Sequence, residues 1–396
     1  MSLVLTAFTA TSCIGRGLAA TVASLEERRG GLEPCAFETV ALDTCVGEVP
    51  GVDEVRMPPE LGEFECRNNR LAQLALAQDG FATAVADCVA RLGASRIGLW
   101  LGTSTSGILE TELAYRRRDP GTGALPADFR YRGAHNTFSV AAFVQRALAL
   151  EGPAAVISSA CSSSAKVFAS AQRAIAAGLV DAAVVGGVDS LCLTTLYGFH
   201  SLQLVARTPC RPFDAARDGI SIAEAAAFAL LEPPGAPLTP DAVLLLGCGE
   251  SSDAWHMSSP HPEGRGARAA MERALAAARL TPPGIDYLNF HGTGTPSNDA
   301  AEARAVAAVL GSRTPGSSTK GATGHALGAA GALEAVICAL ALRDGFMPGG
   351  INTSTIDAGL GVSYLLESRP ARLKRVMSNS FGFGGSNCSL VLGRAE

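Results

Sequence analysis

The chain has 396 residues, of which 47% are apolar and 17% charged, and its formal net charge is −5. This composition is too apolar for a disordered protein, and the acidic balance argues against a nucleic-acid-binding protein, which carries a basic stripe. No apolar run reaches the roughly 20 residues that a transmembrane helix needs, so we expect no membrane span.

Glycine and proline residues divide the chain into alternating apolar strands and amphipathic helices. We predict strands, in chain order, at residues 2–8, 96–101, 154–158, 182–186, 225–231, 243–248, 287–290, 362–366 and 387–392. We predict helices at residues 69–92, 138–150, 162–177, 266–279, 299–310 and 328–343. Most of the strands are apolar without alternation, which is typical of strands covered by helices on both faces. The sequence therefore predicts a layered α/β fold.

Two segments interrupt this pattern. Residues 116–135 are polar and rich in arginine and glycine, so we predict a loop-dominated insertion there. Residues 233–240 contain four prolines and are predicted to connect two halves of the chain. Both halves repeat a plan of glycine-rich turn, strand and alanine-rich helix, which does not by itself establish a duplication.

The eleven cysteines are odd in number and scattered, without a C-x-x-C pair or any metal-ligand spacing. We therefore expect neither a zinc site nor a disulfide framework. The N-terminal residues have no secretory signal pattern and read as a first strand. These observations predict a cytoplasmic protein with reduced cysteines.

The sharpest local feature is Cys161, in the run S-S-A-C-S-S-S between a predicted strand and a predicted helix. Unpaired backbone N–H groups and the positive end of the helix dipole favour a thiolate at such a position. The sequence therefore makes Cys161 a candidate nucleophile. A small buried structural cysteine is the alternative.

Three glycine-rich turns lie further along the chain. His291 lies in H-G-T-G-T at the end of a predicted strand, and His325 ends the run S-T-K-G-A-T-G-H. Residues 379–387 read N-S-F-G-F-G-G-S-N, a loop whose backbone could approach a ligand and aim N–H groups at an oxyanion. A plain flexible turn is the alternative for this loop.

Taken together, these motifs resemble the β-ketoacyl-acyl carrier protein synthases, the Cys-His-His condensing enzymes of thiolase fold. R-P-F-D at residues 211–214 and R-D-G at 217–219 resemble a further signature of that family. The resemblance covers essentially the whole chain. It implies two similar α-β-α-β-α layered halves with mixed five-stranded sheets, residues 1–250 carrying the cysteine and residues 251–396 carrying both histidines.

The resemblance also implies a reaction. Cys161 would accept an acyl group from the phosphopantetheine of an acyl carrier protein, and malonyl-carrier protein would then condense with it in a decarboxylative Claisen step. His291 and His325 would donate hydrogen bonds to the enolate oxygen. Lys320 and Glu334 would form a supporting charged pair. No metal or organic cofactor is expected.

The remaining roles follow from the same resemblance. The backbone N–H groups of Cys161 and Phe383 would bind the tetrahedral oxyanion, and Phe383 would gate entry of the second substrate. Thr293 and Thr295 would bind the pantetheine arm, and Thr105 would tune the acyl pocket at a dimer interface. Because the carrier protein of the family is acidic, a basic patch is needed on this acidic chain. Arg67 and Arg70, three residues apart, resemble the carrier-contact positions of the family and rank first. The other candidates are Arg116–Arg118, Arg130, Arg132 and Arg207.

The chain departs from the family pattern at two places. Residues 6–10 lack the usual T-G-x-G turn, and residues 223–226 read A-E-A-A where the family has G-E-G-A. These departures indicate a diverged branch, so fatty-acid and polyketide or polyene synthesis both remain open. A non-elongating partner subunit of the chain-length-factor type and an acyl-coenzyme A acyltransferase are the alternative functions. We expect a homodimer or a heterodimer with a related subunit.

Overall fold

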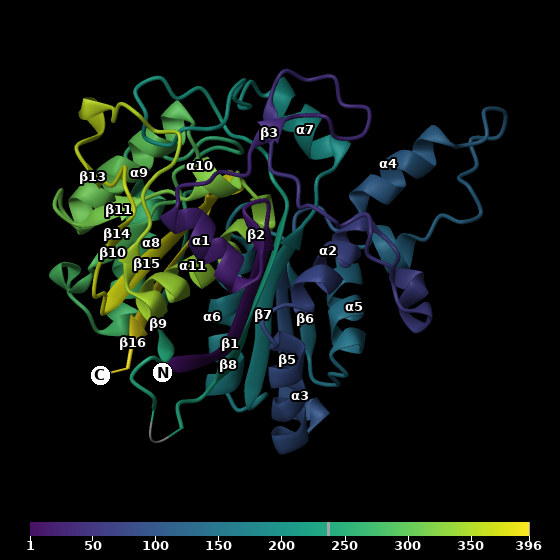
Figure 1. Ribbon diagram of the computed structural model, residues 1–396, viewed down its shortest axis with the longest axis horizontal. Coiled ribbons are helices and arrows are strands. Elements are labelled where there is room, and N and C mark those ends of the chain that lie inside the picture. Colours follow the sequence, from purple (N-terminus) through teal and green to yellow (C-terminus); the bar gives the residue numbers. More distant parts are fainter. Residues whose placement is uncertain (236–237, 396) are drawn as a thin grey trace.

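The computed structural model describes residues 1–235 and 238–395 (Figure 1). The first half of the chain contributes β1 (Leu3–Ser12), β5 (Ile97–Gly102), β6 (Ala154–Ile157), β7 (Ala182–Asp189) and β8 (Ala225–Glu232). These strands lie in the order β6-β5-β7-β8-β1. The first two pairings in this order are parallel and the last two are antiparallel.

The second half repeats this arrangement. It contributes β9 (Val243–Ser252), β10 (Tyr287–Asn289), β11 (Pro315–Ser317), β15 (Arg375–Gly382) and β16 (Ser386–Arg394). The predicted boundary between residues 250 and 251 is therefore wrong, because it cuts through β9, which pairs with β16 of the second half. The order of these strands is β11-β10-β15-β16-β9, again with two parallel pairings followed by two antiparallel ones. Both halves therefore follow one topology, with strands ordered three-two-four-five-one. This identity supports the duplication that the sequence pattern alone does not establish.

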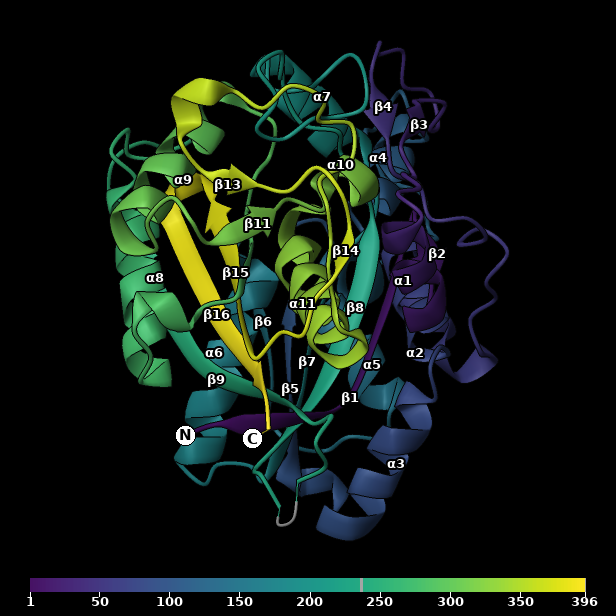
Figure 2. The same ribbon diagram turned by 60° about the vertical axis from the view of Figure 1, so that its left-hand side comes forward.

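The two sheets are joined edge to edge. The first residues of β1 pair antiparallel with β9, so the strands form one continuous hydrogen-bonded path. A short strand, β13 (Ser363–Tyr364), extends the second sheet beyond β11. Both chain termini lie close together at one end of the molecule (Figures 1 and 2).

The helices form the layers above, between and below the sheets. α6 (Ser163–Ala176) and α11 (Ala330–Asp344) lie in the centre, where they contact each other and strands of both sheets (Figure 2). The outer face of the first sheet is covered by α2 (Arg67–Leu76), α3 (Phe81–Leu92) and α5 (Ser139–Ala147). The outer face of the second sheet is covered by α8 (Arg265–Ala278) and α9 (Pro296–Val309). The predicted layered α/β fold is therefore confirmed.

The sequence of α11 explains its central position. Its residues from Ala330 to Leu342 are all buried, which suits a helix that is apolar on every side. Gly331 faces α6 so closely that an added Cβ would lie 2.7 Å from the backbone nitrogen of Ala165. Small residues at this contact bring the N-termini of the two central helices together.

All nine predicted strands are present with shifted ends, and the longest predicted helix is wrong. Residues 69–92 form two helices, α2 and α3, because Asp79 (φ 55°) and Gly80 (φ 68°) break the helix between them. Both residues are in the left-handed region, which a continuous α-helix cannot include. The turn lets Asp79 accept the backbone N–H of Leu18.

Several elements were not predicted. The central strand β15 runs into the segment that the sequence presented as a glycine-rich loop. Helices α1 (Leu18–Glu26), α4 (Ile108–Arg116) and α7 (Leu193–Ser201) were also missed, as were the short elements β2 (Gly15–Arg16), β3 (Glu33–Pro34), β4 (Cys45–Val46), α10 (Lys320–Thr323), β12 (Phe346–Met347) and β14 (Arg369–Pro370).

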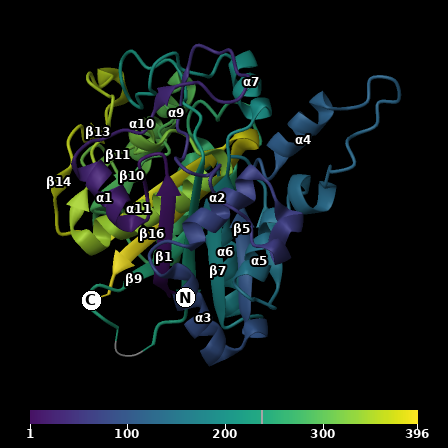
Figure 3. The same ribbon diagram turned by 45° about the vertical axis from the view of Figure 1, so that its right-hand side comes forward.

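The two interrupting segments lie at the surface. The predicted insertion follows α4 and projects from the body of the molecule (Figures 1 and 3). In the predicted connection at 233–240, residues 236–237 lie outside the described residues, and the rest joins β8 to β9. Throughout the part of the chain that the structure describes, we find no helix of the length and apolarity needed to cross a bilayer.

Candidate active site

Cys161 lies in a tight turn between β6 and α6. Ala160 adopts φ 53°, a left-handed conformation that reverses the chain just before the cysteine. The Ser163 hydroxyl braces this turn, since it accepts the Ser159 backbone N–H (2.8 Å) and donates to the Ala160 carbonyl (2.5 Å). The Cys161 side chain is buried beside the N-terminus of α6.

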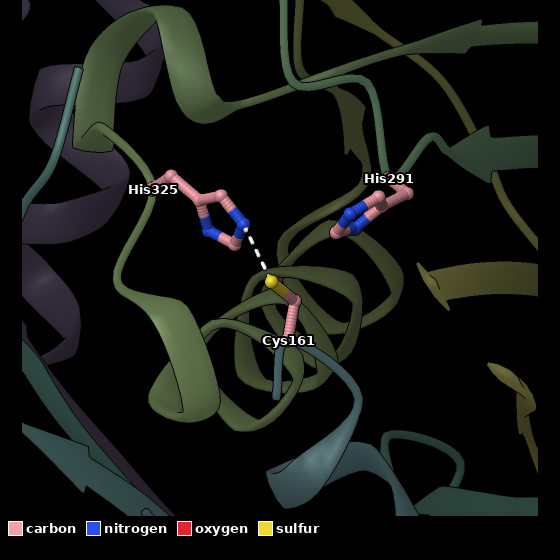
Figure 4. Close-up of side chains that lie close together, drawn as sticks. All are labelled: Cys161, His291 and His325. Atoms are coloured by element: carbon pink, nitrogen blue, oxygen red, sulfur yellow. Dashed lines mark hydrogen bonds between the residues drawn. The ribbon is translucent and has the colours of Figure 1, made fainter. Parts of the chain in front are cut away.

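Both candidate histidines meet this cysteine. His325 Nε2 lies 3.1 Å from Cys161 Sγ, and the rings of His325 and His291 stand edge to face with centroids 5.5 Å apart (Figure 4). The Cys161 sulfur and one ring nitrogen from each histidine all lie within 4.8 Å of one another. Residues 130 and 34 positions apart in the sequence thus form a single Cys-His-His group.

Burial controls the charges of this group. It lowers the pKa of His291 and His325 well below the ordinary value, and the Lys320 ammonium lowers both further, so both imidazoles are neutral. Burial raises the pKa of the Cys161 thiol to about 11, although Lys320 and the Phe383 backbone N–H act in the opposite direction. Burial therefore opposes the thiolate that the helix N-terminus favours, and the Cys161 sulfur carries its proton at neutral pH.

Lys320 connects His291 to α11. Its ammonium donates to the His291 carbonyl (2.5 Å), lies 3.5 Å from His291 Nδ1 and forms a buried ion pair with Glu334. Because an ammonium only donates, Nδ1 accepts. The ring proton of His291 is then on Nε2, which leaves that nitrogen as a donor.

The C-terminal glycine loop closes over the cysteine. The Phe383 backbone N–H hydrogen-bonds to Cys161 and stabilises its ionised sulfur. A Cβ at Gly382 would lie 2.8 Å from the Ser159 carbonyl oxygen and 3.2 Å from the Cys161 nitrogen, so only glycine allows this approach. The Phe383 ring packs against Phe199 with centroids 5.4 Å apart.

A narrow cavity of about 50 Å³ leads to these side chains. Its apolar lining comes from Phe199, Leu204, Ile220, Phe381 and Phe383, and its polar lining includes Ser258, Thr293, Thr295, Ser297 and Asn298. The Thr293 and Thr295 hydroxyls are 2.9 Å apart and face this space as a pair. Thr105 does not line it, because its hydroxyl is buried and donates to Asp189 (2.9 Å).

Two carboxylates that the sequence analysis missed hold the His291 turn. Glu302 accepts the backbone N–H groups of His291 and Gly292, each at 2.8 Å, and burial raises its pKa to about 7. Asp299 accepts the N–H of Thr293 (3.0 Å). The available signal was their position, since both lie in the first two turns of the helix that follows H-G-T-G-T.

The carrier-docking prediction is wrong for Arg67. Its side chain is only 4% exposed and its guanidinium is held by Glu224, Asp53 and Glu48, so no partner can reach it. Arg70 is 19% exposed and lies 3.4 Å from Asp53 and 3.5 Å from Glu65. Its docking role stays a prediction.

The duplicated fold and its Cys-His-His group define a thiolase-like protein, and comparisons identify the family. The model of the beta-ketoacyl synthase N-terminal domain matches residues 64–234, and that of the C-terminal domain matches residues 242–354. The chain belongs to the β-ketoacyl synthase family.

Solved structures agree with this assignment. The ketosynthase ApeO, in complex with its chain length factor ApeC from Xenorhabdus doucetiae, is 40% identical with a TM-score of 0.90, covering 100% of this chain and 98% of that one. The ishigamide ketosynthase/chain length factor is 26% identical with a TM-score of 0.89, covering 100% of this chain and 99% of that one. The predicted thiolase-like fold is confirmed.

Curated relatives match over a shorter region. The 3-oxoacyl-[acyl-carrier-protein] synthase 2 of Coxiella burnetii is 38% identical over 62% of this chain and 63% of its own length. The protein of the same name from Mycobacterium tuberculosis is 37% identical over 60% of each chain. The chain thus spans less than two thirds of the length of these relatives.

Proposed function

We propose that the protein is a β-ketoacyl-acyl carrier protein synthase that joins a Cys161-bound acyl group to a malonyl unit with loss of carbon dioxide. The observation that carries this proposal is the convergence of Cys161, His291 and His325 at the end of one cavity. A nucleophile with two neutral imidazoles beside it suits carbon–carbon bond formation through an enolate.

The first step loads the enzyme. The Cys161 sulfur attacks the carbonyl of an acyl thioester, and the pantetheine thiol leaves. The thiol starts protonated, so its proton must depart as the new bond forms. His325 Nε2 at 3.1 Å is placed to accept this proton and to pass it to the departing pantetheine sulfur. The N–H groups of Cys161 and Phe383 stabilise the tetrahedral oxyanion.

The second step forms the new bond. A malonyl thioester loses carbon dioxide, and its enolate carbon attacks the Cys161 thioester. The bond between the acyl carbon and Cys161 Sγ breaks, the released thiolate takes one proton from the solvent, and a β-ketoacyl thioester leaves. His291, with its proton on Nε2, donates to the enolate oxygen, because Lys320 occupies the Nδ1 side.

The proposed partners are an acyl carrier protein and a second synthase-like chain. The edge strand β6 is apolar, yet all four of its residues are partly exposed. Pairing this edge with another chain would cover it. Light scattering of the purified chain distinguishes a homodimer from a chain that dimerises only with a related subunit. All eleven cysteines are free thiols, which suits the reducing cytoplasm that we propose.

Intact mass spectrometry tests the proposal. The wild-type protein, incubated with acyl-carrier protein, should gain the acyl mass, and malonyl-carrier protein should then release carbon dioxide and a β-ketoacyl product without any added cofactor. Cys161→Ala should show no adduct, whereas Cys35→Ala, at a cysteine outside the cavity lining, should behave as wild type. An adduct on Cys161→Ala refutes the assignment.

The same experiment separates the alternatives. An adduct without condensation would indicate an acyltransferase, and neither adduct nor product would indicate a non-elongating partner subunit. A panel of carrier proteins that differ in acyl length and saturation completes the design. The acyl group retained on Cys161 distinguishes fatty-acid from polyketide or polyene synthesis.

A further inference from the structure

A buried ion pair lies behind the active site. Glu224 is fully buried, and its two oxygens accept Arg67 Nη2 at 2.7 Å and Nε at 2.9 Å in a bidentate arrangement. The same two oxygens also accept the backbone N–H groups of Val49 (2.9 Å) and Leu191 (3.0 Å). One carboxylate thus holds together α2, the segment after β4 and the turn before α7.

Arg67 is equally constrained. Besides Glu224, it donates to Asp53 (2.7 Å) and Glu48 (3.0 Å), and its guanidinium carbon lies 5.1 Å from the centroid of the Phe37 ring. A planar fork of this kind fixes a carboxylate in both position and rotation, which a lysine cannot do. The pair is therefore a rigid anchor for the residues just before Glu224.

Those residues hold His325 by its backbone. The His325 N–H donates to the Ser221 carbonyl (2.7 Å), and the Ala223 N–H donates to the His325 carbonyl (3.0 Å). On the other side of this segment, Gly47 donates to the Ile222 carbonyl and accepts from Glu224, both at 2.9 Å. The backbone around His325, the Ser221–Glu224 segment and Gly47 thus form a ladder of hydrogen bonds. His325 lies at one edge of this ladder, and Glu224 is the last residue of its middle segment.

Besides its edge-to-face contact with the His291 ring, the His325 imidazole has a hydrogen-bond partner on only one of its nitrogens within the described part of the chain. Its Nδ1 has no hydrogen-bond partner among the described residues, and Nε2 contacts Cys161. Gly324, at φ 67°, lies so close to this ladder that an added Cβ would meet the Ala223 Cβ at 2.6 Å. The position of the imidazole over the sulfur therefore depends on its backbone.

We propose that Arg67 and Glu224 are a positioning pair that, through the Ser221–Ala223 backbone, keeps His325 Nε2 in contact with the Cys161 sulfur. The effect on turnover rests on the proposed function. The effect on the cysteine itself does not, because the 3.1 Å contact joins two side chains of this chain and involves no substrate.

The test is the pH dependence of Cys161 alkylation by iodoacetamide, followed by peptide mass spectrometry. His325→Ala provides the profile expected when the contact is lost. Glu224→Gln keeps the side-chain size but places an amide N–H against one of the Arg67 donors. This variant should change the alkylation rate of Cys161 at least fivefold, in the same direction as His325→Ala. Condensation should lose at least tenfold in kcat, with little change in KM.

Asp181→Asn is the matched control, because Asp181 also binds an arginine, Arg96, through two contacts of 2.8 Å, without touching the ladder. It should reproduce the wild-type profile. If Glu224→Gln does not fold, Arg67→Lys is measured instead, since it retains the charge and loses the fork.

A folded variant with the wild-type alkylation profile overturns the proposal. So does a His325→Ala profile identical to that of the wild type, because the contact would then have no effect to transmit. A wild-type protein that reacts at Cys161 with the expected dependence on Glu224, yet condenses no substrate, would refute the proposed function and leave the positioning role intact.

Discussion

Replacing Lys320 with methionine should separate the structural role of the buried ion pair from its role beside His291. In the wild-type protein, burial raises the pKa of Glu334 from 4.5 to about 7 even though Lys320 opposes the shift. A pKa difference of this size means that ionisation of Glu334 lowers the free energy of unfolding by about 3 kcal/mol. Without Lys320 the loss is greater, since breaking a buried pair costs about 3–5 kcal/mol.

The sign of the pH dependence follows from the same shift. A carboxyl whose pKa is raised by folding binds its proton more tightly in the folded state, so stability decreases as pH rises from about 4.5 through the folded value. In Lys320→Met the folded pKa of Glu334 exceeds the wild-type value of about 7. The stability difference between variant and wild type should therefore shrink on acidification from pH 8 to pH 6.

Urea unfolding at pH 6, 7 and 8, at one protein concentration, measures this difference. The double variant Lys320→Met/Glu334→Leu removes both charges and should recover most of the stability. It should not recover condensation, because His291 Nδ1 still lacks its donor. A double variant as unstable as the single one, or a loss below about 1 kcal/mol at every pH, would refute the reasoning.

Three other changes test neighbouring parts of the molecule. Activity should fall as pH drops below about 7, because protonated Glu302 accepts the backbone N–H groups of the His291 turn less strongly. In Glu302→Gln, kcat should be lower and should depend less on pH on the acid side of the pH–rate profile. An acid side identical to that of the wild type would contradict this role. Gly331→Ala should lower the free energy of unfolding by about 1–3 kcal/mol, because its Cβ would meet the Ala165 backbone. Gly62→Ala, which has open space around it, should lower the free energy of unfolding less in the same urea assay. Phe383→Ala should shorten the lifetime of the Cys161 acyl adduct, since it removes a wall of the cavity, and mass spectrometry over time would show an unchanged lifetime if the ring does not gate the site.

The sequence predicted those parts of the site that depend on local chemistry. Cys161, His291 and His325 stand out because each lies in a turn next to an apolar element, and such turns have a recognisable composition. The meeting of these residues could not be derived from local pattern, because it depends on the packing of two halves. Glu302 was missed for a related reason. A carboxylate in an alanine-rich helix reads as solvent-exposed until tertiary structure buries it against backbone N–H groups.

Arg67 is a second residue whose burial could not be predicted from local sequence, and here the error produced a false site residue instead of a missed one. Two arginines three residues apart predict a basic helix face, and only the fold reveals that Glu224, from a distant segment, neutralises one of them. The missed strand β15 has a different cause. Its sequence, R-V-M-S-N-S-F-G, is half polar. These polar side chains can be buried because they find partners elsewhere in the fold: Asn379, for example, donates to Glu302 and accepts from Ser389.

The duplication explains why the reactive groups meet. Cys161 follows the third strand of the first half and precedes its central helix α6, and His325 lies between the third strand of the second half and its central helix α11. The two helices pack at their N-termini, so equivalent turns of the two halves face each other.

The turns after the second and fourth strands have diverged. In the second half they carry His291 and Phe383, which line the cavity. In the first half, Thr105 lies in the turn after β5 and Asp189 is the last residue of β7. Asp189 accepts the Thr105 hydroxyl and also the Gly328 N–H at 2.6 Å. Gly328 lies three residues after His325, so the first half contributes Cys161 and also holds the turn that brings His325 to it.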